Sequence, residues 1–293
     1  MNTTFGVEAD SLIRVPATAN LMIDSADRVN FTSSTPWDFT INKPNNLIQG
    51  FFTRIGVTEV VLDWCVPNIS DDNGLNTFIV SDISGTPISS NTGTITIPDG
   101  CYTMAALLNE IVAQLNLVSW GVAGVTFAVS QFGGRVSIGC TRTFQVSGSP
   151  LLVALAIPNN QIQVNISNLY IPCCADIRPY TYIDITSSQL TSVQSVKDAS
   201  TAILVRDVLC RWYFDEDTQE SYDQYGFPIY QGYRPFCRRR IFSPPKQIKW
   251  ESITNVGQLS FQVYDNAGDL LTYSPPASTS HLNWRMTLQL SEA

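Results

Sequence analysis

Few residues in this chain of 293 residues could perform acid–base or nucleophilic chemistry. His281 is the single histidine, and it stands in a loop rich in Ser, Thr and Pro just before the last apolar segment. An imidazole base would have to be this residue, and we interpret it as an ordinary surface histidine. The Gly-x-Ser-x-Gly elbow, the Gly-Lys pair of a phosphate-binding loop and the Gly-x-Gly-x-x-Gly turn do not occur in the sequence. We therefore expect no catalytic residues, no bound cofactor and no enzymatic activity.

The candidate metal ligands have the wrong spacing. Cys173 and Cys174 are adjacent, so in a strand they point to opposite faces and cannot chelate one zinc ion. A calcium-binding loop that begins at Asp215 would need Gly at its sixth position, where Glu220 stands. The run 71–74 (Asp-Asp-Asn-Gly) has the composition of a turn. We expect no metal site.

One segment has the composition of a binding surface. Tyrosines mixed with Gly and Pro are favoured at protein interfaces, although buried loop packing is an equally good explanation. The arginine run that follows either balances the acidic start at 215–220, which we favour, or meets nucleic acid or an acidic patch on a partner. The candidate partner-interface residues are Tyr222, Tyr225, Tyr230, Tyr233, Arg238, Arg239 and Arg240.

The composition excludes several classes of protein. The chain holds 17 Lys and Arg against 25 Asp and Glu, a net charge of −8, so nucleic-acid contact is not expected. Hydrophobic residues make up 44% and aromatic residues 11% of the chain, which is enough for a folded core. The longest apolar run, 151–157, is far shorter than a membrane span. Seven scattered cysteines indicate reduced thiols made inside a cell.

Alternation of apolar and polar residues with a period of two predicts about a dozen strands. Clear examples are 37–41, the hairpin 125–140 with a turn at 133–134, 259–263 followed by a turn at 265–268, and 284–290 at the C-terminus. Within 53–64 the apolar phase switches near Thr58 and Glu59, which predicts a bulge or a strand that bends between two sheets. The segment 202–214 is apolar on both faces, which predicts a central strand.

One main helix interrupts this pattern. Leu107, Leu108, Ile111 and Leu115 have helical spacing, and Thr103 can cap the N-terminus of a helix over 103–116. A second, short helix is expected at 150–156. Together these elements predict an all-β fold, a β-sandwich with one main α-helix and loop insertions.

No linker divides the chain and no internal repeat of fixed period occurs. We expect an N-terminal arm over residues 1–17 and one domain over residues 18–293. That domain would carry insertions at about 84–160 and 215–245, because a single sandwich of this kind reaches only about 200–250 residues.

The order of the elements resembles the penton, or minor capsid, proteins of virophages, polinton-like viruses and related double-stranded DNA viruses with jelly-roll shells. The strongest local signature is the Ile-Thr-Ile-Pro-x-Gly-x-Tyr-Thr pattern over 95–103, which enters the amphipathic helix. The rest of the resemblance comes from the long strand 55–64, the hairpin 125–140, and the segments 144–146, 182–185, 202–204 and 259–269. The resemblance covers roughly residues 18 to 290, and the insertion at 215–245 has no counterpart that we can place.

The resemblance implies a single jelly roll that forms homopentamers at the icosahedral vertices of a virion. Its neighbours would be trimers of a double-jelly-roll major capsid protein, and whether a spike protein docks on top is left open. The cysteines and the short apolar runs lead us to expect synthesis in the host cytoplasm and no membrane insertion. An alternative is a receptor- or carbohydrate-binding jelly-roll component of a spike or fibre, in which tyrosines would stack on sugar rings. An enzyme built on a β-sandwich is the third hypothesis, and only His281 and scattered carboxylates support it.

Overall fold

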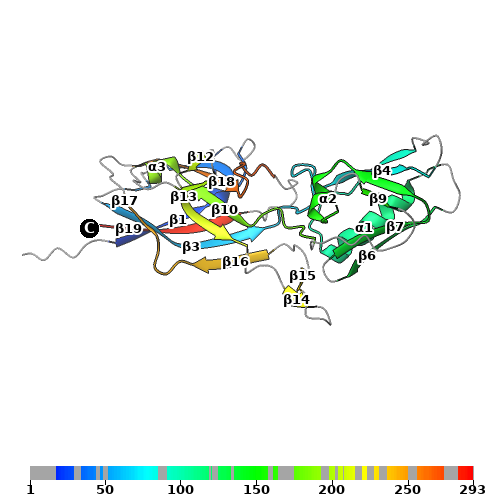
Figure 1. Ribbon diagram of the computed structural model, residues 1–293. Helices are drawn as coiled ribbons and strands as arrows, with labels where there is room; N and C mark the ends of the chain where they lie inside the picture. Colours follow the sequence, from blue (N-terminus) through cyan, green and yellow to red (C-terminus); the bar gives the residue numbers. More distant parts are fainter. Residues whose placement is uncertain are drawn as a thin grey trace, which may run out of the picture.

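Two lobes joined by a narrow neck make up the described part of the chain (Figure 1). The computed structural model describes residues 18–29, 34–43, 47–48, 52–84, 91–118, 120, 125–132, 135–157, 161–163, 175–192, 198–201, 204–206, 208–214, 220–222, 228–230, 236–249, 256–273 and 283–292. The predicted N-terminal arm, His281, Cys173 and Cys174 lie outside these ranges, so they remain predictions. None of the described helices is long and apolar enough to cross a membrane.

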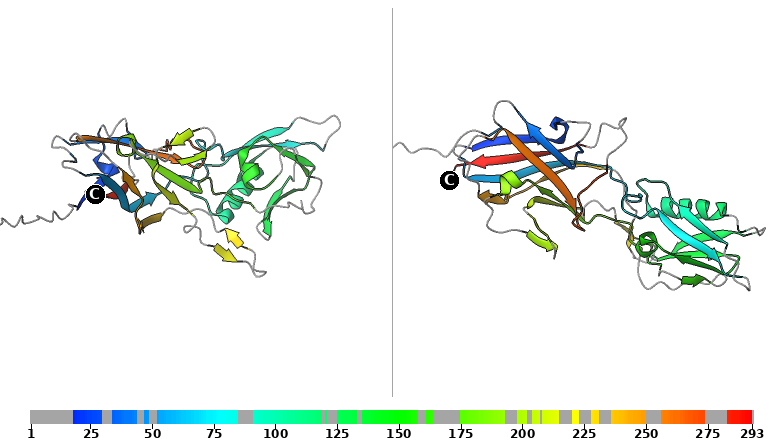
Figure 2. Two further views of the ribbon diagram at one scale, coloured as in Figure 1. Left: turned by 60° about the vertical axis from the view of Figure 1, so that its left-hand side comes forward. Right: turned by 90° about the horizontal axis from the view of Figure 1, so that it is seen from above.

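The first lobe is a sandwich of two antiparallel sheets (Figure 2). One sheet has the order β1-β19-β3-β16, with β17 also paired to β3, and the other has the order β13-β10-β18-β2. The strands of the first sheet are β1 (Thr18–Asp24), β19 (Trp284–Ser291), β3 (Arg54–Trp64), β16 (Phe236–Ile241) and β17 (Gln247–Lys249). Those of the second are β13 (Val208–Tyr213), β10 (Tyr182–Thr186), β18 (Gln258–Asp265) and β2 (Asp38–Asn42).

The pairing pattern identifies this lobe as a jelly roll, as the sequence predicted. The main strands pair from the chain ends inward: β1 with β19, β2 with β18, β3 with β16, and β10 with β13. These are the pairings of one long hairpin. Two further pairings, β19 with β3 and β10 with β18, arise when that hairpin is rolled up into two sheets.

Large aromatic side chains fill the space between the two sheets. The Trp37 ring lies 5.4 Å from that of Trp64, and the Phe39 ring lies 5.4 Å from that of Trp284. All four side chains are buried. Tilted and edge-on aromatic pairs at this spacing are favourable beyond the area they bury, by about 0.5–1.5 kcal/mol each. The predicted inward-facing alternation of 37–41 and 284–290 is therefore confirmed.

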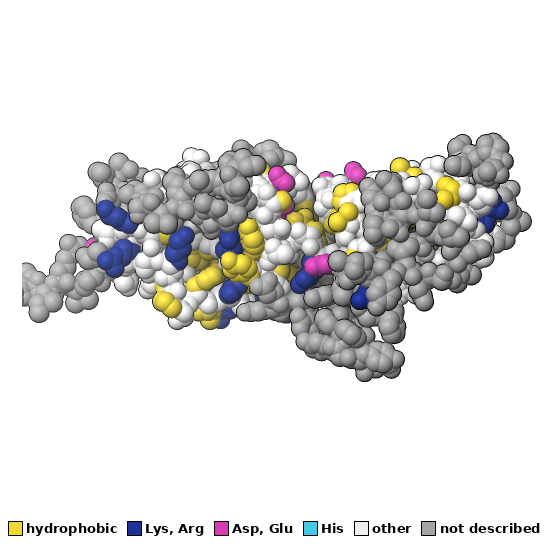
Figure 3. Space-filling model, in the orientation of Figure 1, with side chains coloured by type: hydrophobic (Ala, Val, Ile, Leu, Met, Phe, Trp, Pro, Cys, Tyr) yellow, Lys and Arg dark blue, Asp and Glu magenta, His cyan; other side chains and the backbone are white. Residues whose placement is uncertain are grey.

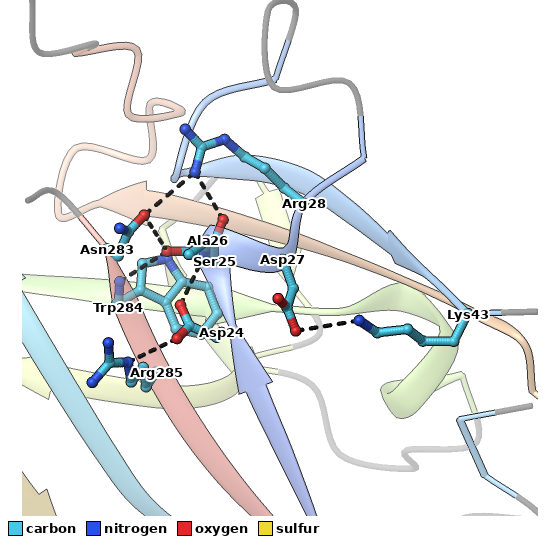
Figure 4. Close-up of polar contacts among 9 residues, drawn as sticks. All are labelled: Asp24, Ser25, Ala26, Asp27, Arg28, Lys43, Asn283, Trp284 and Arg285. Atoms are coloured by element: carbon cyan, nitrogen blue, oxygen red, sulfur yellow. Dashed lines mark hydrogen bonds and ion pairs between the residues drawn. The ribbon is translucent and has the colours of Figure 1, made fainter. Parts of the chain in front are cut away.

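A polar cluster where β1 leads into the short 3-10 helix η1 (Ser25–Asp27) fastens the start of the jelly roll to its last strand (Figure 4). The backbone N–H of Trp284 donates to the Ser25 hydroxyl oxygen at 2.9 Å. Arg28 donates to the Ser25 carbonyl at 2.8 Å, and Arg285 pairs with Asp24 at 2.8 Å. The Trp284–Ser25 and Arg285–Asp24 contacts join residues more than 250 positions apart, so they form only when the hairpin has closed.

The phase switch within β3 is a bulge, one of the two predicted outcomes. The register between β3 and β19 pairs Glu59 with Thr287 and Val57 with Leu288, which leaves Thr58 as an extra residue. The Thr58 hydroxyl donates to the Thr287 carbonyl at 3.1 Å. Val57 and Val60 consequently both reach the core.

The prediction of a central strand over 202–214 is wrong. This stretch divides into β12 (Leu204–Arg206), which pairs with β11 (Asp198–Thr201), and β13, which pairs with β10 at the edge of its sheet. Leu209 and Cys210 are buried, and the short helix α3 (Ser188–Thr191) packs against β13. Apolar residues can occupy both faces of β13 because α3 packs against this edge strand.

The second lobe is inserted between β3 and β10 and has a hydrophobic core of its own. It contains a sheet of order β5-β4-β8-β9, the hairpin β6-β7, and two helices. The elements are β4 (Thr77–Asp82), β5 (Thr92–Thr96), α1 (Met104–Leu117), β6 (Phe127–Phe132), β7 (Arg135–Cys140), β8 (Phe144–Ser147), α2 (Pro150–Ala154) and β9 (Gln161–Gln163).

The helix α1 confirms the predicted main helix and its cap. The Thr103 hydroxyl accepts from the N–H of Ala106, and Leu107, Ile111 and Leu115 are fully buried. The expectation of one core with an insertion at about 84–160 needs correction, because the buried residues form two separate clusters and the second runs from Ile69 to Ile177. Periodicity cannot reveal this division, since both clusters use the same strand pattern.

A buried ion pair stabilises the second lobe. The Asp82 carboxylate has no exposed side-chain surface and lies 2.9 Å from the Arg142 guanidinium. Burial favours the neutral acid, but hydrogen bonds from Ser84 and Arg142 and the charge of Arg142 outweigh it, so the pKa of Asp82 is lowered. This contribution to stability is present above the unfolded-state pKa of Asp82 and is lost as the pH falls through its lowered folded-state pKa.

Asn68 is the hub of the neck between the lobes. Its side-chain amide donates to the carbonyls of Tyr102 at 3.0 Å and Ile177 at 3.2 Å, and its oxygen accepts from the Tyr102 N–H at 2.7 Å. Asn68 itself is fully buried. One side chain thus joins the segment that enters the second lobe, the start of α1 and the segment that returns to the jelly roll.

We expect Asn68→Ala to lower the free energy of unfolding by about 2–4 kcal/mol, because it leaves buried carbonyl and N–H groups without partners. Thermal and urea unfolding followed by circular dichroism measure this loss. Asn68→Asp keeps the acceptor and loses both donors, so it should be similarly destabilising, whereas Asn20→Ala on the exposed face of β1 should change stability by less than about 0.5 kcal/mol. Equal effects of the neck and surface substitutions would contradict the role of Asn68.

Candidate interaction surface

The three arginines named as candidate partner-interface residues lie in the edge strand β16. We call Arg238, Arg239 and Arg240 the arginine edge. β16 pairs with β3 and, among the described residues, with no other strand. An unpaired strand edge can bind another chain, and charged side chains limit such pairing to suitable partners.

The arginine edge presents charge to both faces of its sheet. Arg238 and Arg240 pair in register with Leu62 and Val60, which face the core, so they extend across the open side of the sandwich. Arg239 lies on the outer face, where its guanidinium pairs with Glu59 at 2.7 Å. Two of the three arginines therefore lie between the edges of the two sheets.

Aromatic rings lie beneath these guanidinium groups. The Arg240 guanidinium carbon is 6.0 Å from the centre of the Trp212 ring and 5.7 Å from that of Phe242. Arg238 lies 5.9 Å from the Phe236 ring. Ile241, the next residue along β16, is 63% exposed. Arginine combined with aromatic and aliphatic surface is the composition enriched in protein–protein interfaces.

The neighbouring edge strand β13 continues this surface. Arg211 donates two hydrogen bonds to the buried Asp184 carboxylate, at 2.7 and 2.8 Å, and its guanidinium carbon lies 4.0 Å from the centre of the Tyr182 ring. Tyr213 is 42% exposed beside it. Figure 3 shows basic and hydrophobic side chains together over this part of the jelly-roll lobe.

The tyrosines of the predicted interface loop are only partly placed. Tyr222 lies in β14 (Glu220–Tyr222) and Tyr230 in β15 (Pro228–Tyr230), and the two strands form a hairpin in which Tyr230 pairs with Glu220. Tyr225 and Tyr233 fall outside the described residues. In Figure 1 the hairpin lies on the same lower side of the molecule as β16. The interface assignment of all seven residues remains a prediction.

A second surface, which the sequence analysis missed, lies at the junction of the lobes. A cavity of about 370 Å³ has Asp72, Asp265 and Asp269 in its lining, together with Tyr180 and Tyr273. We call it the acidic cavity. No ion pair joins its three aspartates to a basic side chain among the described residues. In Figure 3 acidic side chains stand on the upper rim of the notch between the lobes.

Two turns carry the acidic residues of the cavity. The first has a hydrogen bond from the Gly74 N–H to the Asp71 carbonyl at 3.0 Å, and the second has one from the Gly268 N–H to the Asp265 carbonyl at 3.1 Å. Both glycines have positive φ, which explains why Gly occupies these positions. Sequence analysis predicted both turns, but they lie nearly 200 residues apart, and only the fold brings them together.

The electrostatic field of the cavity affects its tyrosines. Burial and the nearby charges of Asp265 and Asp72 raise the pKa of Tyr180 to about 12. Burial also raises the pKa of Tyr273, followed by the proximity of Cys65 and Cys101 and then by that of nearby aspartates. The contribution of Asp265 and Asp72 to the raised pKa of Tyr180 reflects a negative potential, and a negative potential attracts a cation.

The described residues offer no arrangement for metal chemistry. Among them, no group of three His, Cys, Asp or Glu side chains is placed to hold a metal ion. Burial, followed by the proximity of Cys65, raises the pKa of the Cys101 thiol to about 11, and burial raises that of Cys210 to about 12. Neutral thiols of this kind are poor nucleophiles and poor ligands.

Comparison with known proteins gives matches of structure alone. No protein-family model matches the chain, and a search of curated proteins finds no match. The chain is similar in structure to the mavirus penton protein, with a TM-score of 0.51 and 12% identity, over 95% of this chain and 99% of that chain. A chain of the Sputnik virophage structure gives a TM-score of 0.46 at 10% identity, over 94% and 98% of the two chains. The fold is that of the mavirus penton protein.

The reactivity of the Cys237 thiol can be used to test whether β16 lies at an exposed edge. It is exposed, and its hydrogen bond with Asp63 raises the pKa of its thiol. We expect Asp63→Asn to lower that pKa and to accelerate alkylation of Cys237 by iodoacetamide at pH 7.5, as followed by peptide mass spectrometry.

The matched control is Asp38→Asn, which removes an exposed carboxylate from β2 and should leave the rate unchanged. Cys210 should stay unmodified in all three proteins. Faster labelling of Cys210 than of Cys237 would contradict the edge position of β16.

Proposed function

We propose that this chain is a structural capsid protein, a penton subunit that forms homopentamers at the vertices of an icosahedral shell. The observation that carries the proposal is the extent of the match with the mavirus penton protein, which spans 95% of this chain and 99% of the other. The likeness therefore includes the jelly roll and the inserted lobe together. A jelly roll alone serves many functions, and the shared insertion is what narrows the choice.

The chemistry of the surface supports an assembly role. Arg240 of the arginine edge lies over the aromatic rings of Trp212 and Phe242. The outer side of β16 has no partner strand among the described residues, and Ile241 is exposed there. Such surfaces are stabilised when a partner covers them. The subunit would act by burying area against its neighbours and would have no enzymatic activity.

In the assembled particle, we propose that the pentamer contacts trimers of a double-jelly-roll major capsid protein and can carry a spike protein on top. The chain would be made in the host cytoplasm and reside at the capsid vertex. The low charged fraction of 14% suits a subunit that packs against others over much of its surface.

We expect the purified chain to form an oligomer with five times the mass of the 32.4 kDa chain, in a concentration-dependent equilibrium with the monomer. Size-exclusion chromatography with multi-angle light scattering measures the mass, and negative-stain images show the symmetry. A strictly monomeric chain at high concentration, or an oligomer without fivefold symmetry, would contradict the proposal.

A further inference from the structure

The arginine edge and the acidic cavity lie on opposite sides of the molecule. In Figure 1, β16 lies at the bottom, and the turn after β18 lies at the top beside the neck. The left view of Figure 2, turned about the vertical axis, keeps this separation. A closed ring with fivefold symmetry requires a head-to-tail contact, in which one patch of each copy meets a different patch on the next.

We propose that the arginine edge of one copy docks into the acidic cavity of the next copy in the ring. This inference rests on the proposed function, and it names the two surfaces that join the subunits. The partner is a second copy of this chain, because one protomer carries both halves of a complementary pair.

The cavity suits an arginine side chain in both shape and chemistry. Its aromatic and aliphatic lining, from Tyr180, Leu75 and Leu271, can pack against the methylene stem of an arginine. Asp72 and Asp269 are exposed and have no basic partner among the described residues, so their carboxylates are available for a guanidinium. A volume of about 370 Å³ leaves room for more than one such side chain.

The arginine edge in turn leaves at least one cation available. Arg240 has no acidic partner among the described residues, and its guanidinium lies over Trp212 and Phe242. Arg239 remains held by Glu59. Aromatic rings beneath a guanidinium hold it in place without neutralising it, so less side-chain freedom is lost when a carboxylate approaches.

Charge reversal tests this pairing directly. Arg238→Glu with Arg240→Glu makes the edge acidic, and Asp72→Lys with Asp269→Lys makes the cavity basic. We expect each two-residue variant to raise the dissociation constant of the ring about 100-fold or more, because like charges then meet at every contact. Sedimentation velocity over a range of concentrations measures this constant.

The four-residue variant that combines both reversals should recover rings to within about tenfold of the wild type, since opposite charges meet again. Lys43→Glu and Glu110→Lys reverse charges elsewhere on the surface and should leave the dissociation constant within about threefold. If the edge reversal lowers the melting temperature, Arg238→Gln with Arg240→Gln replaces it and should still weaken the ring about tenfold.

The outcomes separate this inference from the proposed function. If the wild type forms rings and both two-residue variants form them equally well, the docking is overturned and the penton role stays intact. Failure of the four-residue variant to recover would also overturn it, as would rings that form only with Ca²⁺ and depend on the cavity alone. A wild-type chain that forms no ring under any condition would instead overturn the proposed function.

Discussion

The register of β3 is the constraint on which the rest of the molecule depends. It lies at the centre of its sheet, between β19 on one side and β16 with β17 on the other. The bulge at Thr58 lets residues before and after it face the core, and β16 gives way to β17 at the same level. Trp64 ends the strand where the chain leaves for the neck. Both the arginine edge and the acidic cavity are therefore held at fixed positions relative to one strand.

The sequence predicted what local patterns control and missed what distant contacts decide. The cap at Thr103, the bulge near Thr58 and the turns at Gly74 and Gly268 each depend on a few neighbouring residues, and all four are present. The second core was missed because its strands, such as β4 and β7, carry the same alternation as strands of the jelly roll. The acidic cavity was missed because its two turns meet only through the fold.

The proposed docking describes how a subunit with a net charge of −8 would recognise its own copies. A net charge of −8 makes copies repel each other at long range, so a random encounter is unfavourable. In the proposed docking, the cationic arginine edge meets the anionic acidic cavity in one orientation of the two copies only. This complementarity would contribute more to specificity than to affinity. Because the Debye length is about 8 Å at physiological salt, this selection acts only near contact, where exposed residues such as Ile241 are covered.

The most direct test of the account is the structure of the assembled chain by single-particle cryo-electron microscopy. The account predicts a closed ring of five copies in which β16 of each protomer meets the acidic cavity of the next. Two-fold dimers, open filaments, or a fivefold ring joined through other surfaces of the jelly roll would contradict it.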